Sequence, residues 1–375
     1  MPESTPTAVI GCGRWGINLV RVLARLGSLK AVADRDPEAL ARAGAVAGDI
    51  TLARDPEAVF DDPAIRAVMI ATPADTHGSL ATLAIGAGKD VFVEKPLAIR
   101  LEEARALVAL AREANRVLMV GHLLEYHPAV LKLYELVRGG ELGEIRYMIS
   151  NRLNLGRIRT EENALWSFAP HDIAVILRLA GAMPFEVCAT GGCYVQAGIA
   201  DITVTQLRFL NGTRAHIFVS WLHPFKGQKL VVIGAKKMAT FDDVHKKLTL
   251  IDLRISWEVG HPVPITTPEV DVPFSLDEPL ERECLHFLQC VETRSAPYTD
   301  GANGLDVLRV LDAAGASLAA NGRPVRVAGE RGPGAGPTEG EVAPVITTAP
   351  QPAVPGRVTV ESDVDFPARG TRGQD

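Results

Sequence analysis

The chain has 375 residues, of which 47% are hydrophobic, and a formal net charge of −6 at pH 7. This length and composition predict a globular protein of two domains. The acidic balance excludes a general attraction to nucleic acid or to an anionic membrane, so a phosphate-bearing ligand requires a local basic cluster. We find no apolar run of membrane-spanning length and no signal-peptide pattern, and therefore expect a cytoplasmic protein with no membrane partner.

The cysteines are odd in number and lack CxxC pairs or zinc-ligand spacing. They are Cys12, Cys188, Cys193, Cys284 and Cys290. We expect reduced, mostly buried thiols and no metal site.

The chain opens with a strand pattern at 7–10, a glycine-rich turn at 11–16 (GCGRWG) and a helical pattern from Ile17. In a G-x-G-x-x-G turn the first glycine permits the tight turn, the second lets the backbone approach a pyrophosphate and the third lets helix pack on strand. The helix N-terminus then offers unpaired N–H groups to the anion. The cofactor contacts expected in this turn are Gly11, Gly13, Arg14, Trp15 and Gly16.

A second strand pattern at 29–33 ends at Asp34, 18 residues after Gly16. An acid at this position accepts the ribose hydroxyls and repels a 2′-phosphate, so Asp34 favours NAD. Arg35 follows directly and leaves NADP possible.

Strand and helix patterns then alternate to residue 121, with strands at 50–52, 67–71, 90–93 and 117–121. This alternation predicts a parallel sheet with helices on both faces, and hence a nucleotide-binding domain over 1–121. Thr72, Pro73 and His77 follow the strand at 67–71 and are further candidate cofactor contacts. For His77, a surface position at a helix start is the alternative interpretation.

The strand at 90–93 ends in Glu94, Lys95 and Pro96. Ligands bind at this edge of open α/β sheets, so all three are candidate cofactor contacts. A lysine that is partly desolvated there, beside a cationic cofactor, can have a pKa low enough to move protons near neutral pH. The alternative is an ordinary loop lysine paired with Glu94.

Several ordered segments, GCGRWG, ATPADTH, VEKPLA and VGHLLEYHPA, together resemble the Gfo/Idh/MocA family of NAD(P)-dependent oxidoreductases. The resemblance covers nearly all of 7–328 and includes HDI, EPLERECLHFL and GLDVLRVLDAAGASL. It implies that Lys95 is catalytic and that the bond before Pro96 is often cis. It also implies a second domain with an open, predominantly antiparallel sheet, whose outer face commonly forms oligomers. We therefore expect a homo-oligomer, either a dimer or a tetramer.

The second domain is expected over 122–328 and begins with a helix to about residue 138. Glu125, Tyr126 and His127 cannot all face a core, so at least one should reach the cleft, and Tyr126 is a candidate substrate contact. Strand patterns follow at 144–153 and repeatedly from 185 to 255. Helices at about 279–320 should pack back toward the first domain, and the Gly/Pro-rich tail at 329–375 should be disordered.

Arg152, Arg157 and Arg159 fall within eight residues, together with Asn154. Guanidinium groups match phosphate oxygens bidentately, so this segment predicts a grip on the diphosphate of a nucleotide sugar. A solvated strand end is the alternative.

In the family, a helix after this segment commonly carries an aspartate and, four residues later, a histidine. His171 matches the histidine, whereas Ser167 stands in place of the aspartate. The resemblance implies that Lys95 and His171 handle the proton and that both, with Ser167, contact substrate. Asp172 points about 100° away from His171 around the helix, so we expect it to be mainly structural.

Residues 151–173 look most similar to family members that oxidise C3 of UDP-N-acetylhexosamines or their uronates. The sequence thus predicts NAD-dependent oxidation of a nucleotide sugar to a 3-keto sugar. An NAD(P)H-dependent 3-ketoreductase of a nucleotide deoxysugar is the main alternative, and cyclitol oxidation is a weaker one. A non-catalytic NAD-sensing binding protein is the alternative from another class, motivated by Ser167.

Overall fold

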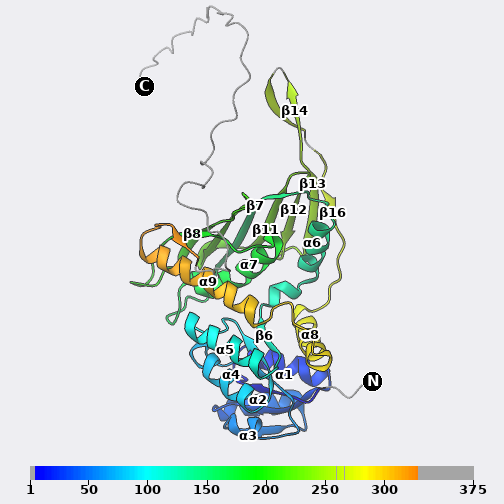
Figure 1. Cartoon of the computed structure of the whole chain (residues 1–375), viewed down its shortest axis with the longest axis vertical. Coiled ribbons are helices and arrows are strands. Elements are labelled where there is room, and N and C mark those ends of the chain that lie inside the picture. Colours follow the sequence, from blue (N-terminus) through cyan, green and yellow to red (C-terminus); the bar gives the residue numbers. More distant parts are fainter. Residues whose placement is uncertain (1–4, 259, 266, 328–375) are drawn as a thin grey trace, which may run out of the picture. The chain divides into compact units, whose positions relative to one another are not determined.

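The computed structural model describes residues 5–258, 260–265 and 267–327. The tail predicted to be disordered, 329–375, lies outside the described residues. The described chain consists of two large sheets, the helices packed on them and a small two-stranded sheet (Figure 1). The prediction of a Rossmann domain followed by a domain with a predominantly antiparallel sheet is confirmed. Among the described helices, none is both long and apolar enough to cross a bilayer.

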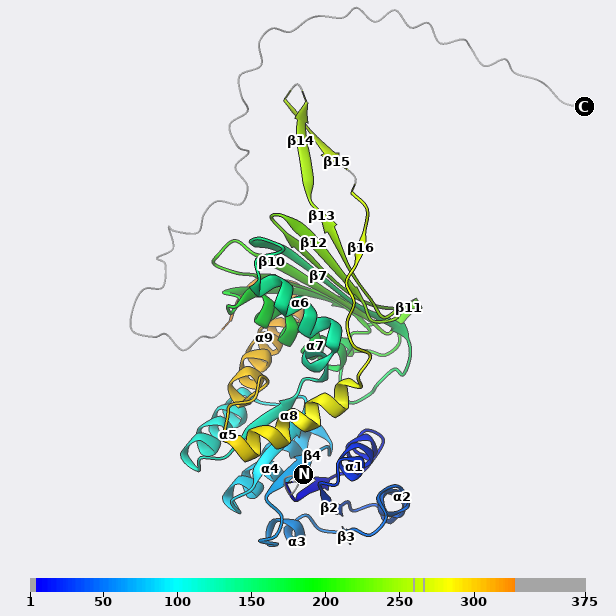
Figure 2. The ribbon, with the colours of Figure 1, turned by 90° about the vertical axis from the view of Figure 1, so that its right-hand side faces the viewer.

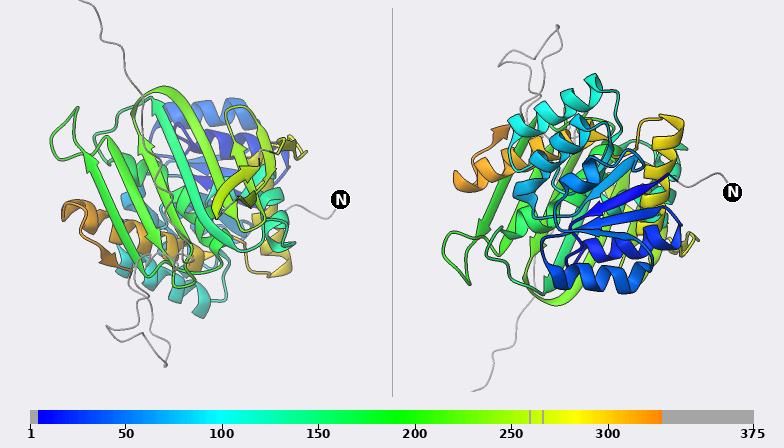
Figure 3. Two further views of the ribbon diagram at one scale, coloured as in Figure 1. Left: turned by 90° about the horizontal axis from the view of Figure 1, so that it is seen from above. Right: turned by 90° about the horizontal axis from the view of Figure 1, so that it is seen from below.

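The first sheet has six parallel strands in the order β3-β2-β1-β4-β5-β6. They are β1 Thr7–Ile10, β2 Leu29–Ala33, β3 Thr51–Ala53, β4 Ala67–Ile70, β5 Asp90–Glu94 and β6 Leu118–Gly121. Every residue of β1, β4 and β6 is buried, because helices cover both faces of the sheet (Figure 3). The strand order reverses between β1 and β4, and ligands bind at such a switch point, outside the carboxyl ends of the strands.

Five α-helices connect these strands: α1 Gly16–Arg25, α2 Pro37–Ala47, α3 Glu57–Phe60, α4 His77–Gly86 and α5 Leu101–Glu113. In α1 the buried residues include Leu19, Val20 and Leu23, which recur at the helical period and face the sheet. Asp36 caps α2 by accepting a hydrogen bond from the Glu38 N–H. A short 3₁₀ turn, η1 (Ala74–Thr76), precedes α4.

The second sheet has nine strands in the order β16-β13-β12-β11-β7-β10-β9-β8-β17. They are β7 Ile145–Leu155, β8 Glu186–Gly192, β9 Ile202–Arg208, β10 Arg214–Ser220, β11 Leu222–Gly234, β12 Lys237–Asp242, β13 Lys247–Asp252, β16 Val270–Asp271 and β17 Val325–Arg326. Strands β7 and β10 pair in parallel, and the other neighbouring strands pair antiparallel. In β10, buried Ala215, Ile217 and Val219 alternate with more exposed residues, so one face of the sheet forms a core.

Helices α6 (Pro128–Arg138), α7 (Ala164–Ala180) and α9 (Gly301–Ala319) lie on that face (Figure 2). The sequence did not predict the hairpin of β14 (Arg254–Glu258) and β15 (His261–Ile265), which extends from the sheet (Figure 2). Pro262 and Pro264 lie within β15, and proline weakens a strand prediction because it cannot donate to the ladder.

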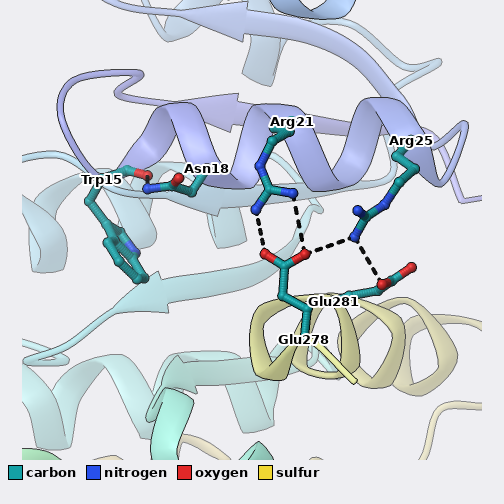
Figure 4. A network of polar contacts seen from close by, with 6 residues as sticks. All are labelled: Trp15, Asn18, Arg21, Arg25, Glu278 and Glu281. Carbon is teal, nitrogen blue, oxygen red and sulfur yellow. Dashed lines mark hydrogen bonds and ion pairs between the residues drawn. The ribbon is translucent and has the colours of Figure 1, made fainter. Parts of the chain in front are cut away.

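Helix α8 (Pro279–Thr293) packs against the first domain. The Phe92 and Phe287 rings make an edge contact with centroids 5.9 Å apart. Arg21 and Arg25, one turn apart on α1, pair with Glu278 and Glu281 at the start of α8, and Arg25 lies 3.0 Å and 2.9 Å from these two carboxylates (Figure 4). These pairs are partly exposed and each contributes little, whereas the aromatic contact removes apolar surface from water.

Candidate active site

The turn between β1 and α1 has the shape that a dinucleotide requires. Gly11 has a φ of +86°, and a Cβ there would lie 2.8 Å from the Thr72 side chain. A Cβ on Gly16 would lie 1.9 Å from the Gly11 carbonyl oxygen, whereas a Cβ on Gly13 would meet nothing within 4 Å. The first and third glycines therefore allow close packing, and the second leaves backbone open to a pyrophosphate.

Asp34 follows β2 and is held by the backbone, because its carboxylate accepts the Cys12 N–H at 2.7 Å and the Asp36 N–H at 2.9 Å. It lines a cavity of about 480 Å³ at the switch point. Other predicted cofactor contacts that line this cavity are Gly11, Gly13, Arg35, Thr72 and Pro73. The residues present therefore fit the adenosine and pyrophosphate portions of NAD. Arg54 also lines the cavity beside Arg35, which places two cations near Asp34.

The interpretation of His77 as a surface residue is wrong. Its side chain is 1% exposed, and its ring nitrogens lie 2.7 Å from the Pro96 carbonyl oxygen and 2.9 Å from that of Thr72. Burial lowers the pKa of His77. Through these two contacts His77 connects the segment after β4 to the Lys95–Pro96 loop.

Glu94 and Lys95 stand at the carboxyl end of β5, and the Lys95–Pro96 bond is cis. Glu94 accepts the indole N–H of Trp15, and burial raises the pKa of Glu94 to about 7. The Lys95 Nζ donates to the backbone carbonyl of Ser167 at 3.1 Å. Lys95 is therefore held by α7 of the second domain and does not form a simple surface pair with Glu94.

Burial lowers the pKa of Lys95, and the neighbouring charges partly oppose one another. Glu162 has the largest effect among these charges and raises the pKa, as does Glu94, whereas Arg159 and Arg152 lower it. A lysine with a depressed pKa carries more of the neutral amine that a general base requires.

Helix α7 brings Ser167 and His171 to the same region, one turn apart. The Asn163 side chain caps the helix through the Trp166 N–H, and Pro170 lies inside it. Ser167 is buried, and its hydroxyl has no partner in the part of the chain that the structure describes. Its contribution to Lys95 is the backbone carbonyl, which sequence reasoning on side chains missed.

His171 lies beside His122, with ring centroids 6.3 Å apart. Burial, followed by the charges of Lys95 and Arg152, lowers the pKa of His171 well below its ordinary value. Burial also lowers the pKa of His122 to about 3. Both rings are therefore neutral at physiological pH, so His171 can accept a proton or orient a hydroxyl.

Two of the three arginines predicted to hold a phosphate are already paired with acids. Arg152 is held by Asp172, with nitrogen to oxygen distances of 2.9 Å and 3.1 Å, and Asp172 also accepts from Ser150 at 2.8 Å. Asp172 thus has the structural role that we expected. Arg159 pairs with Glu162 at 2.7 Å, whereas Arg157 is exposed. Arg152 and the partly buried Asn154 lie in β7, whereas Arg157 and Arg159 follow its end.

Glu162 is the acid that sequence reasoning missed. It directly precedes Asn163, the cap of α7, and its Oε1 is inaccessible to solvent. It is the carboxylate that acts most strongly on Lys95, in a family where an aspartate on the helix is expected. The proximity depends on how the loop at 156–163 folds, which residue spacing does not show.

The expected helix at 122–138 is divided into a 3₁₀ turn, η2 (Leu123–Tyr126), and α6, because His127 and Pro128 start a new helix. Glu125, Tyr126 and His127 are all buried, with exposures of 0%, 2% and 7%, and His127 also lines a cavity that has His171 in its wall. Polar partners on α7 and α8 replace the water that the buried Glu125 and Tyr126 side chains would otherwise bind. Glu125 pairs with Arg178 at 2.7 Å.

The Tyr126 hydroxyl lies 3.0 Å from the His286 Nδ1 and 3.1 Å from the Thr299 Oγ1. Its polar group is thus used by α8 and the segment before α9, and a contact of Tyr126 with substrate stays a prediction.

A second buried acid lies opposite Glu94. Glu283 is fully buried, and neither of its carboxylate oxygens has a partner within the described residues. Glu283 precedes Phe287 by one helical turn, and Glu94 follows Phe92 by two strand residues, so the aromatic contact brings both acids to the same side. Burial, and then the Glu94 charge, raises the pKa of Glu283 well above its ordinary value.

A Rossmann turn fitted to a dinucleotide, a lysine of lowered pKa after β5 and a neutral histidine on α7 are together typical of an NAD-dependent oxidoreductase. Residues 6–122 match the family model described as an oxidoreductase family with an NAD-binding Rossmann fold, and residues 130–240 match the GFO/IDH/MocA C-terminal domain. The chain belongs to the Gfo/Idh/MocA family.

The chain is 28% identical over 303 residues to UDP-N-acetylglucosamine 3-dehydrogenase from Acidithiobacillus ferrooxidans, covering 80% of this chain and 93% of that protein. It is 27% identical to scyllo-inositol 2-dehydrogenase (NAD(+)) from Bacillus subtilis, covering 87% and 97%. A solved structure of the Acidithiobacillus enzyme has a TM-score of 0.76 at 26% identity, over 84% of this chain and 97% of that chain. Levoglucosan dehydrogenase in complex with NADH and levoglucosan, at 22% identity and a TM-score of 0.75, shares the fold, with coverages of 86% and 99%.

Proposed function

We propose that the protein oxidises a secondary hydroxyl, at C3, of a nucleotide sugar such as a UDP-N-acetylhexosamine or its uronate, with NAD⁺ as acceptor. The observation that carries the proposal is the bond from the Lys95 Nζ to the Ser167 carbonyl, because it holds an amine of lowered pKa on the helix of His171. The similarity to a UDP-N-acetylglucosamine 3-dehydrogenase supports the choice of substrate class.

In this proposal NAD⁺ supplies the acceptor for the hydride. The neutral Lys95 amine takes the hydroxyl proton, and His171 orients the same hydroxyl or relays its proton. Glu162 favours the ammonium form that Lys95 reaches after the transfer, and Arg159 and Arg152 oppose it. The Ser167 carbonyl fixes the direction of the amine in both protonation states.

The nucleotide portion has weaker support than the arginine pattern first indicated, since Arg152 and Arg159 are both paired with acids. The exposed Arg157 can approach a diphosphate without breaking such a pair. The same residues would also serve a 3-ketoreductase working in the opposite direction, because a base for oxidation is the acid for reduction.

The test is formation of NADH by purified protein with NAD⁺ and a panel of UDP-N-acetylhexosamines and their uronates. A parallel reaction contains 2-oxoglutarate to recycle tightly held cofactor, and the 3-keto product is identified by mass. Product formation on one of these sugars is the expected result. If no sugar of the panel is oxidised while NADH still binds, the proposal is wrong, and reduction of 3-keto nucleotide sugars or NAD sensing takes its place.

A further inference from the structure

A separate cavity of about 260 Å³ opens beside His171. Its polar lining comes from the residue between η2 and α6, from β7, α7 and β11, and from the turn between β12 and β13: His127, Arg152, His171, Gln228, Asp243 and Lys246. Ligand pockets typically measure roughly 300–1,000 Å³, so this cavity suits one ring of a substrate and not a whole nucleotide sugar. His171 is in its wall, whereas Lys95 is not. In the proposed function the oxidised ring lies against His171, so we assign part of that ring to this cavity.

The cations of this cavity already have partners. Arg152 is bound bidentately by Asp172, and the Lys246 Nζ lies 2.6 Å from the Asp243 Oδ1. Two cations are therefore balanced by two carboxylates.

Both histidines of the wall are neutral. The His127 Nδ1 accepts the Ala129 N–H at 3.2 Å, so the ring proton belongs on Nε2, which lies 3.4 Å from the Asp243 Oδ1. Burial lowers the pKa of His127 and of His171. Asp172 binds Arg152 but does not itself line the cavity. With Asp172 counted, the charges of the wall and of this partner sum to zero at neutral pH.

Asp243 is the centre of this arrangement. Its carboxylate lies next to His127 and Lys246, and its charge also acts on Arg152. A sugar hydroxyl entering the cavity can donate to Asp243 or accept from Arg152 without loss of an ion pair. A sugar carboxylate would be repelled by Asp243 and would have to displace it from Lys246.

We propose that Asp243 is a specificity-determining residue that makes this cavity select an uncharged N-acetylhexosamine ring over the ring bearing a carboxylate at C6. The inference rests on the proposed function, and it narrows the substrate from a UDP-N-acetylhexosamine or its uronate to the UDP-N-acetylhexosamine alone. Lys246 is about half exposed and would be the cation for a uronate if Asp243 did not occupy it.

The experiment compares UDP-N-acetylglucosamine with its uronate by kcat/KM and by calorimetric binding to the NADH complex. Wild-type protein should prefer the uncharged ring by about tenfold or more. Asp243→Asn keeps an oxygen for His127 but releases Lys246, and should move the ratio toward the uronate by about tenfold. The double variant Asp243→Asn, Lys246→Gln is the matched control, because it restores a neutral cavity and should return the ratio toward wild type.

A wild-type preference for the uronate, or an unchanged ratio in Asp243→Asn, would overturn the inference. If neither sugar is oxidised but the uncharged one binds more tightly, the proposed reaction is wrong and the charge selection stands. If neither sugar binds, both proposals fail.

Discussion

The cofactor side and the substrate side of the cleft are built in different ways. The cofactor side is formed by short consecutive segments, since Gly11 to Gly16 and Asp34 follow β1 and β2 directly. The proposed substrate side combines Lys95, Glu162, His171 and Asp243, which lie on separate elements across 149 residues of chain. Local backbone geometry therefore determines the cofactor side, whereas long-range packing and charge balance determine the substrate side.

The largest expected effect comes from the residue that joins the two sides. Lys95→Ala removes the amine held by Ser167 and should lower turnover by roughly 10²–10⁴-fold, the usual contribution of a general acid or base. NADH affinity should change little, because the cofactor cavity is lined by other residues. Steady-state kinetics and NADH titration measure the two quantities. Full activity in Lys95→Ala would remove Lys95 from the catalytic step.

Alanine substitutions of Gly16 and Gly13 test the cofactor side alone. Gly16→Ala places a Cβ 1.9 Å from the Gly11 carbonyl oxygen and should lower the free energy of unfolding by about 1–3 kcal/mol. Gly13→Ala meets no neighbour, so it should leave stability nearly unchanged while weakening NADH binding about tenfold or more. Urea unfolding and NADH titration distinguish the two variants. Equal destabilisation by both would contradict the separate roles of these glycines.

Glu283→Gln tests how the buried acids on α8 affect stability. The pKa of Glu283 is raised in the folded state above its ordinary value of 4.5, so its stabilising contribution is present below that value and is lost as pH rises through the folded-state pKa. Glutamine does not ionise. The free energy of unfolding of Glu283→Gln should therefore increase relative to that of the wild type as pH rises, by about 1–3 kcal/mol.

Urea unfolding at pH 5 and pH 8 measures this difference. Glu281→Gln is the control on the same helix, because its carboxylate is partly exposed and paired with Arg25. If the difference in free energy of unfolding between Glu283→Gln and the wild type is the same at both pH values, Glu283 is not protonated in the folded state.

The smallest effect concerns the charge beside the base. Glu162→Gln removes the acid that raises the pKa of Lys95 and frees Arg159, which lowers it, so both changes lower that pKa. The acid limb of kcat/KM for oxidation should move to lower pH, with less than about tenfold change at the optimum. Glu161→Gln is the matched control, since Glu161 is exposed and bonds Thr160. Identical pH profiles for the two variants would remove Glu162 from this role.

Much of the first domain could be predicted because hydrophobic periodicity and glycine spacing are local properties. The strand at 29–33, the helix at 37–47 and the fingerprint at 11–16 needed no knowledge of distant residues. His77 shows the limit, because a histidine at a helix start is normally exposed, and the Pro96 and Thr72 carbonyls that bury it cannot be read from its neighbours. The hydrogen-bond partners of Tyr126 escape sequence reasoning for the same reason, since His286 and Thr299 are more than 150 residues away.

By itself, the sequence determined the Rossmann turn, the acid at the end of β2, the lysine at the end of β5 and the family, since each depends on order and spacing along the chain. Tertiary structure decided which charges are already satisfied. Arg152 and Arg159 looked alike in sequence, but one is bound by Asp172 and the other by Glu162. The physical reason is that pairing energies depend on distances between folded segments and on their burial, and neither quantity is encoded in the residue types alone.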